Sequence, residues 1–186
     1  QLINLNDLDQ KRVLVWCEQG YGDTIQFARY IKNLTKLGAQ VIFEVQAPLK
    51  DLIQQSFLDC EVIATGQPFH PVDFQVPLLS LPLLFNTEIA SIPNDVPYLK
   101  AGDSKFSYLR MHSDREVKKL HIGLAFSGNP NHKNDFNRSM DLSLLKPLLN
   151  VGNLFVIQKG ITKKVVSYLF TFGIAYKACR SSTDRA

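Results

Sequence analysis

A chain of 186 residues, of which 45% are hydrophobic and 20% charged, has the composition of a globular protein with one domain or two small ones. The formal net charge of +4 is spread along the sequence and indicates neither a nucleic-acid-binding nor a membrane-anchored protein. No apolar run approaches the ~20 residues of a membrane span, and no signal peptide is visible. The three cysteines (Cys17, Cys60 and Cys179) and four histidines lack the spacing of disulfide frameworks or metal sites. We expect a cytoplasmic protein without a bound metal.

Strands and helices alternate through the first half of the chain. Residues 12–17, RVLVWC, form a short apolar run typical of a buried parallel strand. After the turn EQGYGD, apolar residues recur at helical spacing as far as Gly38, which fits a helix C-cap. The next expected elements are strands at 40–46 and 60–65 and a helix at 47–57; within 73–85, a fourth strand runs into a proline-interrupted apolar stretch that starts another helix. This order predicts an α/β fold with a Rossmann-like parallel sheet over residues 11–102, after a leader at 1–10.

The second half of the chain restarts the same pattern. A polar connector with one helix is expected at 103–118, and HIGLAFSG then begins a new strand. A polar loop, the helix MDLSLLKPLL and the strand NLFVIQKG follow, so residues 119–160 read as the incomplete start of a second Rossmann-like domain. The divergent tail at 161–186 fits a helix in KKVVSYLF and a short strand in IAY. We expect disorder from about Lys177 and no functional residue after Gly160.

The turn WCEQGYGDTIQFARY holds two glycines of a dinucleotide-binding fingerprint. Gly20 and Gly22 match the first two glycines of G-x-G-x-x-G, but Ile25 stands where the third would be. Glu44, near the end of the next strand, lies where a ribose-binding carboxylate is found in that fingerprint. The phosphate-loop pattern G-x-x-x-x-G-K-[ST] is missing. A dinucleotide-binding domain is therefore one alternative.

Asp23 is the distinctive residue of this turn. A carboxylate at a helix N-terminus is stabilised by the helix dipole and unpaired backbone N–H groups, so Asp23 fits a helix cap without chemistry. The same position faces the edge of the sheet where α/β proteins bind ligands. Because an anion repels phosphate, a base that acts on a hydroxyl fits Asp23 better than nucleotide binding does. The polar neighbours, which fit sugar binding or a solvated surface equally well, are Gln19, Thr24 and Gln26.

Several longer motifs resemble one family. VLVWCEQGYGDTIQFARYI, PLLSLPLLF, VPYLKA, IGLAFSGNPNHKNDFNRSMDLSLLKPLL and IQKG, over about residues 11–160, are similar to the bacterial glycosyltransferase-like region of tetratricopeptide-repeat proteins. That region is related to the ADP-heptose:lipopolysaccharide heptosyltransferases. The resemblance implies a GT-B architecture, with an acceptor-side Rossmann-like domain followed by a nucleotide-sugar-binding domain. The implied reaction moves a sugar from a nucleotide sugar to a hydroxyl acceptor, a saccharide or a protein, without a further cofactor.

The resemblance also implies site residues. Gly22 and Asp23 match the glycine–aspartate pair of the heptosyltransferase first loop, where the aspartate is the proposed base. The neighbours Gln19, Gly20 and Thr24 would then bind substrate. The loop from Gly128 to Ser139 matches the opening loop of the donor domain; its candidate donor-phosphate ligands are Asn129, Lys133 and Arg138, with His132 nearby. The alternative for these residues is a solvated polar loop.

The resemblance stops at Gly160. The segments that would complete the family's donor site are not recognisable in residues 161–186, and no tetratricopeptide repeat precedes residue 11. We therefore expect a fragment of a glycosyltransferase-like protein, inactive as an isolated chain. A third alternative is a non-catalytic binding or scaffold module that self-associates through the apolar strands LAFSG and LFVIQ.

Overall fold

The computed structural model describes residues 4–102, 120–128, 131–158, 161, 163–171 and 175–176. Contacts divide the chain into two units, Gln1–His112 and Ser113–Ala186. The connector predicted at 103–118 and the helix expected within it lie outside the described residues. Among the described helices, none has both the length and the apolar character needed to cross a bilayer.

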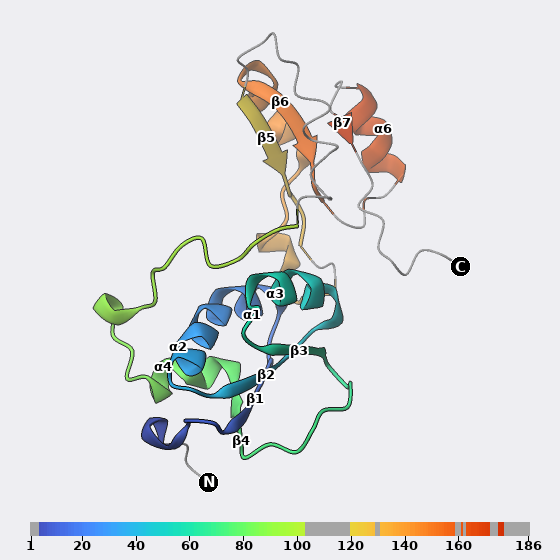
Figure 1. The fold of residues 1–186 in the computed structure, drawn as a ribbon. Coiled ribbons are helices and arrows are strands. Elements are labelled where there is room, and N and C mark those ends of the chain that lie inside the picture. Colours follow the sequence, from blue (N-terminus) through green and yellow to red (C-terminus); the bar gives the residue numbers. More distant parts are fainter. Residues whose placement is uncertain are drawn as a thin grey trace. The chain divides into compact units, whose positions relative to one another are not determined.

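The first unit is built on a parallel four-stranded sheet in the order β3-β2-β1-β4 (Figure 1). This is the predicted Rossmann-like α/β arrangement. Its strands are β1 (Arg12–Trp16), β2 (Gln40–Val45), β3 (Glu61–Ala64) and β4 (Phe74–Pro77). Its α-helices are α1 (Tyr21–Phe27), α2 (Ile31–Lys36), α3 (Lys50–Ser56) and α4 (Leu81–Leu84). Short 3-10 helices are η1 (Leu5–Asp7), η2 (Ala28–Tyr30), η3 (Ala47–Leu49), η4 (Leu78–Ser80) and η5 (Ile89–Ser91).

Both faces of this sheet are apolar, as expected for a parallel sheet buried on both sides. Figure 1 shows α1 to α4 gathered on one side of the sheet, and the main core lies between them and alternate strand residues. Val15, Phe43 and Val62 form one cross-strand row of that core. The opposite face carries a smaller cluster of Leu14, Ile42 and Ile63, with Trp16 and Val72 packed against it.

The segment predicted as a leader packs with the first unit. Leu8 is fully buried in the main core, and Leu5 of η1 packs against that core. Asn4 caps η1 by accepting a hydrogen bond from the Asn6 N–H. Residues 4–10 therefore contribute to the stability of this unit.

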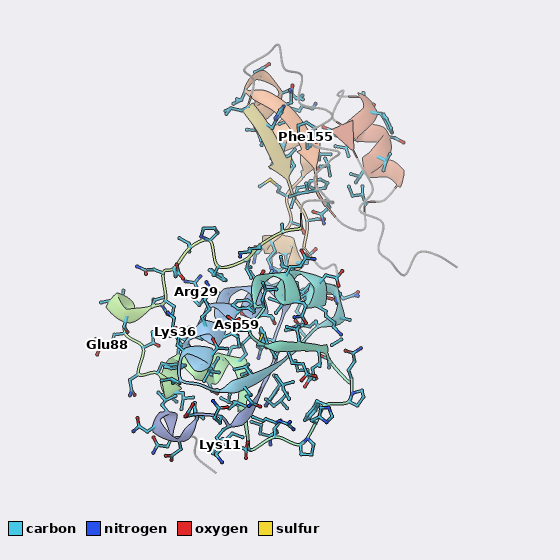
Figure 2. The ribbon with its side chains drawn as sticks, viewed as in Figure 1. Lys11, Arg29, Lys36, Asp59, Glu88 and Phe155 are labelled. Atoms are coloured by element: carbon cyan, nitrogen blue, oxygen red, sulfur yellow. The ribbon has the colours of Figure 1, made fainter. Side chains whose placement is uncertain are left out.

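The single helix predicted between the turn and Gly38 is broken at η2. Two side chains bond to carbonyls that an uninterrupted α-helix would use: the hydroxyl of the distant Tyr98 donates to the Ile25 carbonyl at 3.0 Å, and the Nε of Arg29, in η2 itself, donates to the Gln26 carbonyl at 2.8 Å. Arg29, labelled in Figure 2, also stacks over the Tyr98 ring at 4.9 Å. A side chain that inserts into the hydrogen-bond ladder interrupts a helix in this way.

The second unit has a parallel sheet in the order β5-β6-β7 among its described residues. Its elements are β5 (Leu120–Leu124), η7 (Asp135–Asn137), η8 (Leu142–Asn150), β6 (Gly152–Val156), α6 (Lys163–Thr171) and β7 (Ala175–Tyr176). The predicted helix over 140–149 is found as the 3-10 helix η8, and Pro147 lies inside it, where it supplies no backbone N–H. The Asp141 side chain caps it by accepting the Ser143 N–H at 2.7 Å.

The helix and short strand predicted in the tail are confirmed as α6 and β7. Leu169 of α6 is fully buried in the core of the second unit, with Leu124, Leu154 and Val156 of the sheet. This part of the tail therefore packs on the sheet through apolar contacts. The predicted disorder from Lys177 concerns residues outside those described.

Candidate functional site

The candidate site lies where β1 leaves the sheet. In the order β3-β2-β1-β4 the chain extends first to one side of β1 and then to the other, so the strand order reverses between β1 and β4. Open α/β sheets bind ligands outside the carboxyl ends of their strands at such a reversal. The turn from Cys17 to Gly20, the start of α1 and the start of η4 border this point, and α1 contacts η4.

Asp23 holds the shape of the turn. Its Oδ2 accepts a hydrogen bond from the Gly20 N–H at 3.1 Å. Gly20 is the N-cap of α1, so this bond gives the N-cap N–H an acceptor. Its other oxygen accepts no hydrogen bond from the described residues, and the side chain is half-buried. Asp23 therefore caps α1 with one carboxylate oxygen, and the other oxygen has no hydrogen-bond donor among the described residues.

Thr24 belongs to the interior of the fold. Only 1% of its surface is exposed, and its hydroxyl donates to the Gln46 Oε1 at 3.0 Å. The Gln46 Nε2 in turn donates to the Gln19 carbonyl at 2.8 Å, so the residue that follows β2 holds the β1–α1 turn in place. The expected contact between Thr24 and substrate is not supported by this geometry, because its hydroxyl is buried and already bonded. Gln46, which the sequence did not single out, is the residue that clamps the turn.

Glu18 is the second residue that sequence reasoning missed. It is exposed, follows β1 closely, and its Oε2 accepts a hydrogen bond from the Leu79 N–H of η4 at 3.0 Å. The bond ties the end of β1 to the element after β4, across the reversal of strand order. The sequence signal for Glu18 is a carboxylate shortly after a buried strand. Its hydrogen-bond partner, Leu79, lies too far along the chain to be inferred from the sequence.

The two glycines of the turn are not required by the backbone. Gly20 has φ −72° and ψ 172°, an extended conformation open to any residue. A Cβ at Gly20 would lie 3.6 Å from the Asp23 Oδ2, an ordinary contact, and a Cβ at Gly22 would have no neighbour within 4 Å. If glycine is needed at position 22, the reason is therefore the close approach of a ligand and not the fold.

Replacing Gly22 by alanine is expected to leave the fold intact and to raise the free energy of unfolding by up to about 1 kcal/mol, because alanine is the better helix former. Urea denaturation followed by the fluorescence of Trp16, the single tryptophan, measures this change. Gly66→Ala is the matched control: its surroundings are equally open, but its φ of +84° disfavours alanine, so it should lose about 1 kcal/mol. A destabilised Gly22→Ala variant would contradict the prediction.

The remaining elements of the dinucleotide alternative are scattered. Glu44 is half-buried on β2 beside Trp16, and strand alternation places it on the face that carries Ile42. The Gly20 N–H, which a bound pyrophosphate would need, is already bonded to Asp23. Phosphate binding at this turn would require that bond to break.

The predicted donor loop of the second unit is held by an internal polar network. The Gly128 N–H donates to the Ser139 Oγ at 2.9 Å, and the Ser139 hydroxyl lies 3.1 Å from both oxygens of Asp135. Lys133 and Arg138 are exposed, and neither forms a salt bridge with another described residue. The described part of the loop therefore presents two exposed cations.

Other residues of this loop have defined places or lie outside the described part. The N–H groups of Phe126 and Ser127, which follow β5, both donate to the Gln158 Oε1 at 3.1 Å. These bonds tie the segment after β5 to the segment after β6. His132 is exposed, and its Nδ1 accepts the Asn134 N–H at 3.1 Å. Asn129 lies outside the described residues, so its predicted phosphate contact remains a prediction.

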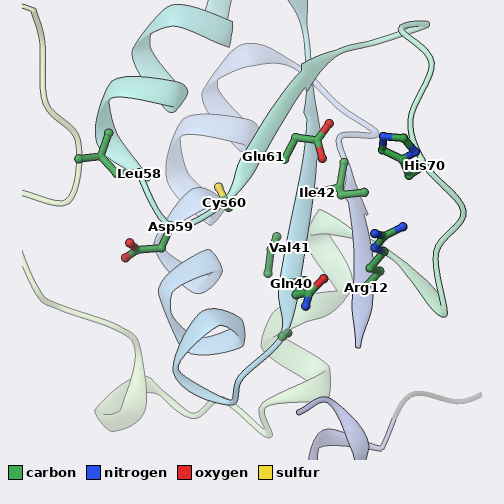
Figure 3. Close-up of a pocket in the computed structure, with 10 residues that line it drawn as sticks. Arg12, Gln40, Val41, Ile42, Leu58, Asp59, Cys60, Glu61 and His70 are labelled. Carbon is green, nitrogen blue, oxygen red and sulfur yellow. The ribbon is translucent and has the colours of Figure 1, made fainter. Parts of the chain in front are cut away.

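A separate cavity of about 410 Å³ lies at the opposite edge of the first sheet (Figure 3). Arg12, Gln40 and Glu61, the first residues of three strands, line it with His70. Cys60 also lines it, and burial, with a smaller effect of Asp59, raises the pKa of its thiol to about 12, which makes it unreactive. The amino ends of parallel strands are not the usual ligand edge. Within the described residues, no group of three His, Cys, Asp or Glu side chains could hold a metal ion.

Comparisons with protein-family models, curated proteins and solved structures found no match to this chain. Its function is therefore argued from the Rossmann-like fold, the geometry of the turn and the sequence motifs.

Proposed function

We propose that this chain belongs to a catalyst of glycosyl transfer from a nucleotide sugar to a hydroxyl acceptor, with the β1–α1 turn on the acceptor side. The observation that carries the proposal is the Asp23 carboxylate at the carboxyl edge of the sheet: one oxygen accepts the Gly20 N–H, and the other accepts no hydrogen bond from the described residues. A carboxylate held in this way can accept a proton from a hydroxyl group. The resemblance of the turn to the first loop of the heptosyltransferases supports the same role.

In the proposed reaction, the open oxygen of Asp23 takes the proton of the acceptor hydroxyl while the acceptor oxygen attacks the anomeric carbon of the donor. The bond from that carbon to the diphosphate breaks, and the nucleoside diphosphate leaves with the electron pair. Lys133 and Arg138 of the second unit would bind the diphosphate and stabilise its charge. A cytoplasmic location is part of the same proposal.

A dinucleotide-binding role is the weaker candidate. The turn lacks the third glycine, and its Gly20 N–H is paired with an anion where a pyrophosphate would lie. Titration with NAD(H), followed by Trp16 fluorescence, tests this role. Micromolar binding would favour it over glycosyl transfer.

The donor side gives the clearest test of the proposed function. Reversing the charge of both Lys133 and Arg138 to glutamate is expected to weaken the binding of nucleoside-diphosphate sugars at least about tenfold, because both cations would contact the diphosphate. Isothermal titration calorimetry with uridine, guanosine and adenosine diphosphate sugars measures the dissociation constants. The affinity of the unsubstituted chain should also fall as salt rises.

The control for this experiment is Lys36→Glu, which reverses one charge at an exposed lysine of the first unit (Figure 2) and so makes half the charge change of the double variant. It should leave donor binding unchanged. Absence of binding by every nucleotide sugar, or equal binding by the double variant, would refute the donor-side assignment. Binding is the primary readout because the sequence predicts no turnover by the isolated chain. Robust turnover abolished by Asp23→Asn would support the proposed base and contradict that expectation.

A further inference from the structure

The cavity of about 410 Å³ at the amino ends of β1, β2 and β3 follows from the register of the sheet (Figure 3). Glu61, the first residue of β3, pairs with Ile42, so β2 extends beyond its neighbour by two residues, Gln40 and Val41. The edge of the sheet is therefore stepped. Both sides of the step, residues 39–42 and 58–61, line the cavity.

The connection from β3 to β4 does not fill this hollow. Parallel strands are usually joined by a helix, but residues 65–73 form no helix. Val72 of this connection packs against the apolar cluster that contains Ile42, and His70 lines the cavity. The space left has the size of a small-molecule site, for which about 300–1,000 Å³ is typical.

Four polar side chains from separate segments line the cavity: Arg12, Gln40, Glu61 and His70. Strand alternation places the first three on the face of the sheet that carries Ile42, as Figure 3 shows. All four are exposed, and none of their side chains forms a hydrogen bond or an ion pair with another described residue. Their hydrogen-bonding groups are therefore available to a ligand in this cavity.

The charges that line the cavity have opposite signs but do not pair. Arg12 and Glu61 lie on strands separated by β2, which puts the strand axes about 10 Å apart, and they form no ion pair with each other. Asp59, also exposed, adds a second carboxylate to the lining. A simple anion would meet two carboxylates for one arginine, whereas a ligand with both charges would give each side a partner.

We propose that this cavity binds a small zwitterion of the amino-acid class, with its carboxylate on Arg12 and its ammonium group on Glu61. A guanidinium binds a carboxylate through two parallel hydrogen bonds, and an ionised carboxylate accepts hydrogen bonds from an ammonium group. The Gln40 amide can donate to the first group and accept from the second. This site lies at the opposite edge of the sheet from Asp23 and does not depend on the proposed glycosyl transfer.

Two single substitutions test the two contacts separately. Arg12→Gln and Glu61→Gln each remove one charge, and neither breaks a described side-chain contact. The hydrogen bond that ties residue 12 to the Asp73 carboxylate, at 2.8 Å, comes from its backbone N–H and survives the substitution. A purely solvating role for these side chains predicts no effect of either variant on ligand binding.

The test measures binding to the full chain by isothermal titration calorimetry and by amide chemical shifts in NMR. The probes are the zwitterions glycine, 4-aminobutanoate and 6-aminohexanoate, and the singly charged butanoate and butylamine. We expect at least one zwitterion to bind at least about tenfold more tightly than either singly charged probe. Arg12→Gln and Glu61→Gln should each weaken that binding about tenfold or more. Lys36→Gln and Glu88→Gln, matched charge changes away from the cavity, should not.

Absence of zwitterion binding, or butanoate binding of equal strength, would overturn the inference, as would unchanged affinities in both cavity variants. Circular dichroism establishes whether the variants are folded. If they are not, the amide shifts of the unsubstituted chain decide: the largest changes should lie in residues 39–42 and 58–61, and changes centred elsewhere would reject this site. Zwitterion binding without nucleotide-sugar binding would reject glycosyl transfer alone, and the converse would reject the zwitterion site alone.

Discussion

Phe43→Ala is expected to reduce the free energy of unfolding of the first unit by about 3–5 kcal/mol, a typical cost for truncating a buried phenylalanine. Phe43 is fully buried in β2, and Val15 and Val62 flank it in the neighbouring strands. The substitution therefore opens a cavity at the centre of the sheet that positions the candidate site. A domain of this size loses roughly 4–8 °C of melting temperature per kcal/mol, so the loss should exceed about 12 °C.

Urea and thermal unfolding followed by Trp16 fluorescence report on this unit, because the single tryptophan lies on β1. Phe69→Ala is the matched control: Phe69 is 43% exposed in the loop between β3 and β4, and its truncation should cost less than about 1 kcal/mol. Equal losses in the two variants would contradict the packing of the main core around Phe43.

The fold was predictable from the sequence where the signal is local. Val13, Leu14 and Val15 are consecutive and all buried, which is the pattern of a parallel strand covered on both faces. The break at η2 was not predictable, because the helix carbonyls there accept hydrogen bonds from the Tyr98 hydroxyl and the Arg29 side chain, and Tyr98 lies far along the chain. Pro147 indicates that residues 140–149 cannot form a regular α-helix, but it does not by itself specify the 3-10 geometry of η8.

In the candidate site too, features set by the adjacent sequence were predictable, and features set by distant contacts were not. The position of Asp23 at the start of α1 follows from the adjacent sequence alone, as does its capping role. The hydroxyl of Thr24 is bonded to Gln46, just after β2, and the carboxylate of Glu18 is bonded to Leu79 of η4; both partners come from other parts of the chain. Polar residues of a turn look alike in a sequence until tertiary contacts separate those that hold the turn from those that face a ligand.

Gly38→Val is expected to destabilise the first unit by about 2–5 kcal/mol, from two physical causes that a second variant separates. Gly38 follows α2 as the predicted C-cap and has φ +81°, a conformation that costs a β-branched residue about 1–2 kcal/mol. A Cβ there would also meet the Asp9 carboxylate, which can turn away, and the Asp9 Cα at 3.2 Å, which can move only with the backbone.

Gly66→Val is the control, because Gly66 has nearly the same φ, +84°, but a Cβ there would have no neighbour within 4 Å. This variant should therefore show the conformational cost alone. Urea denaturation followed by Trp16 fluorescence should therefore rank Gly38→Val as the less stable variant, and equal stabilities would show that the contact between Gly38 and the Asp9 backbone is not tight.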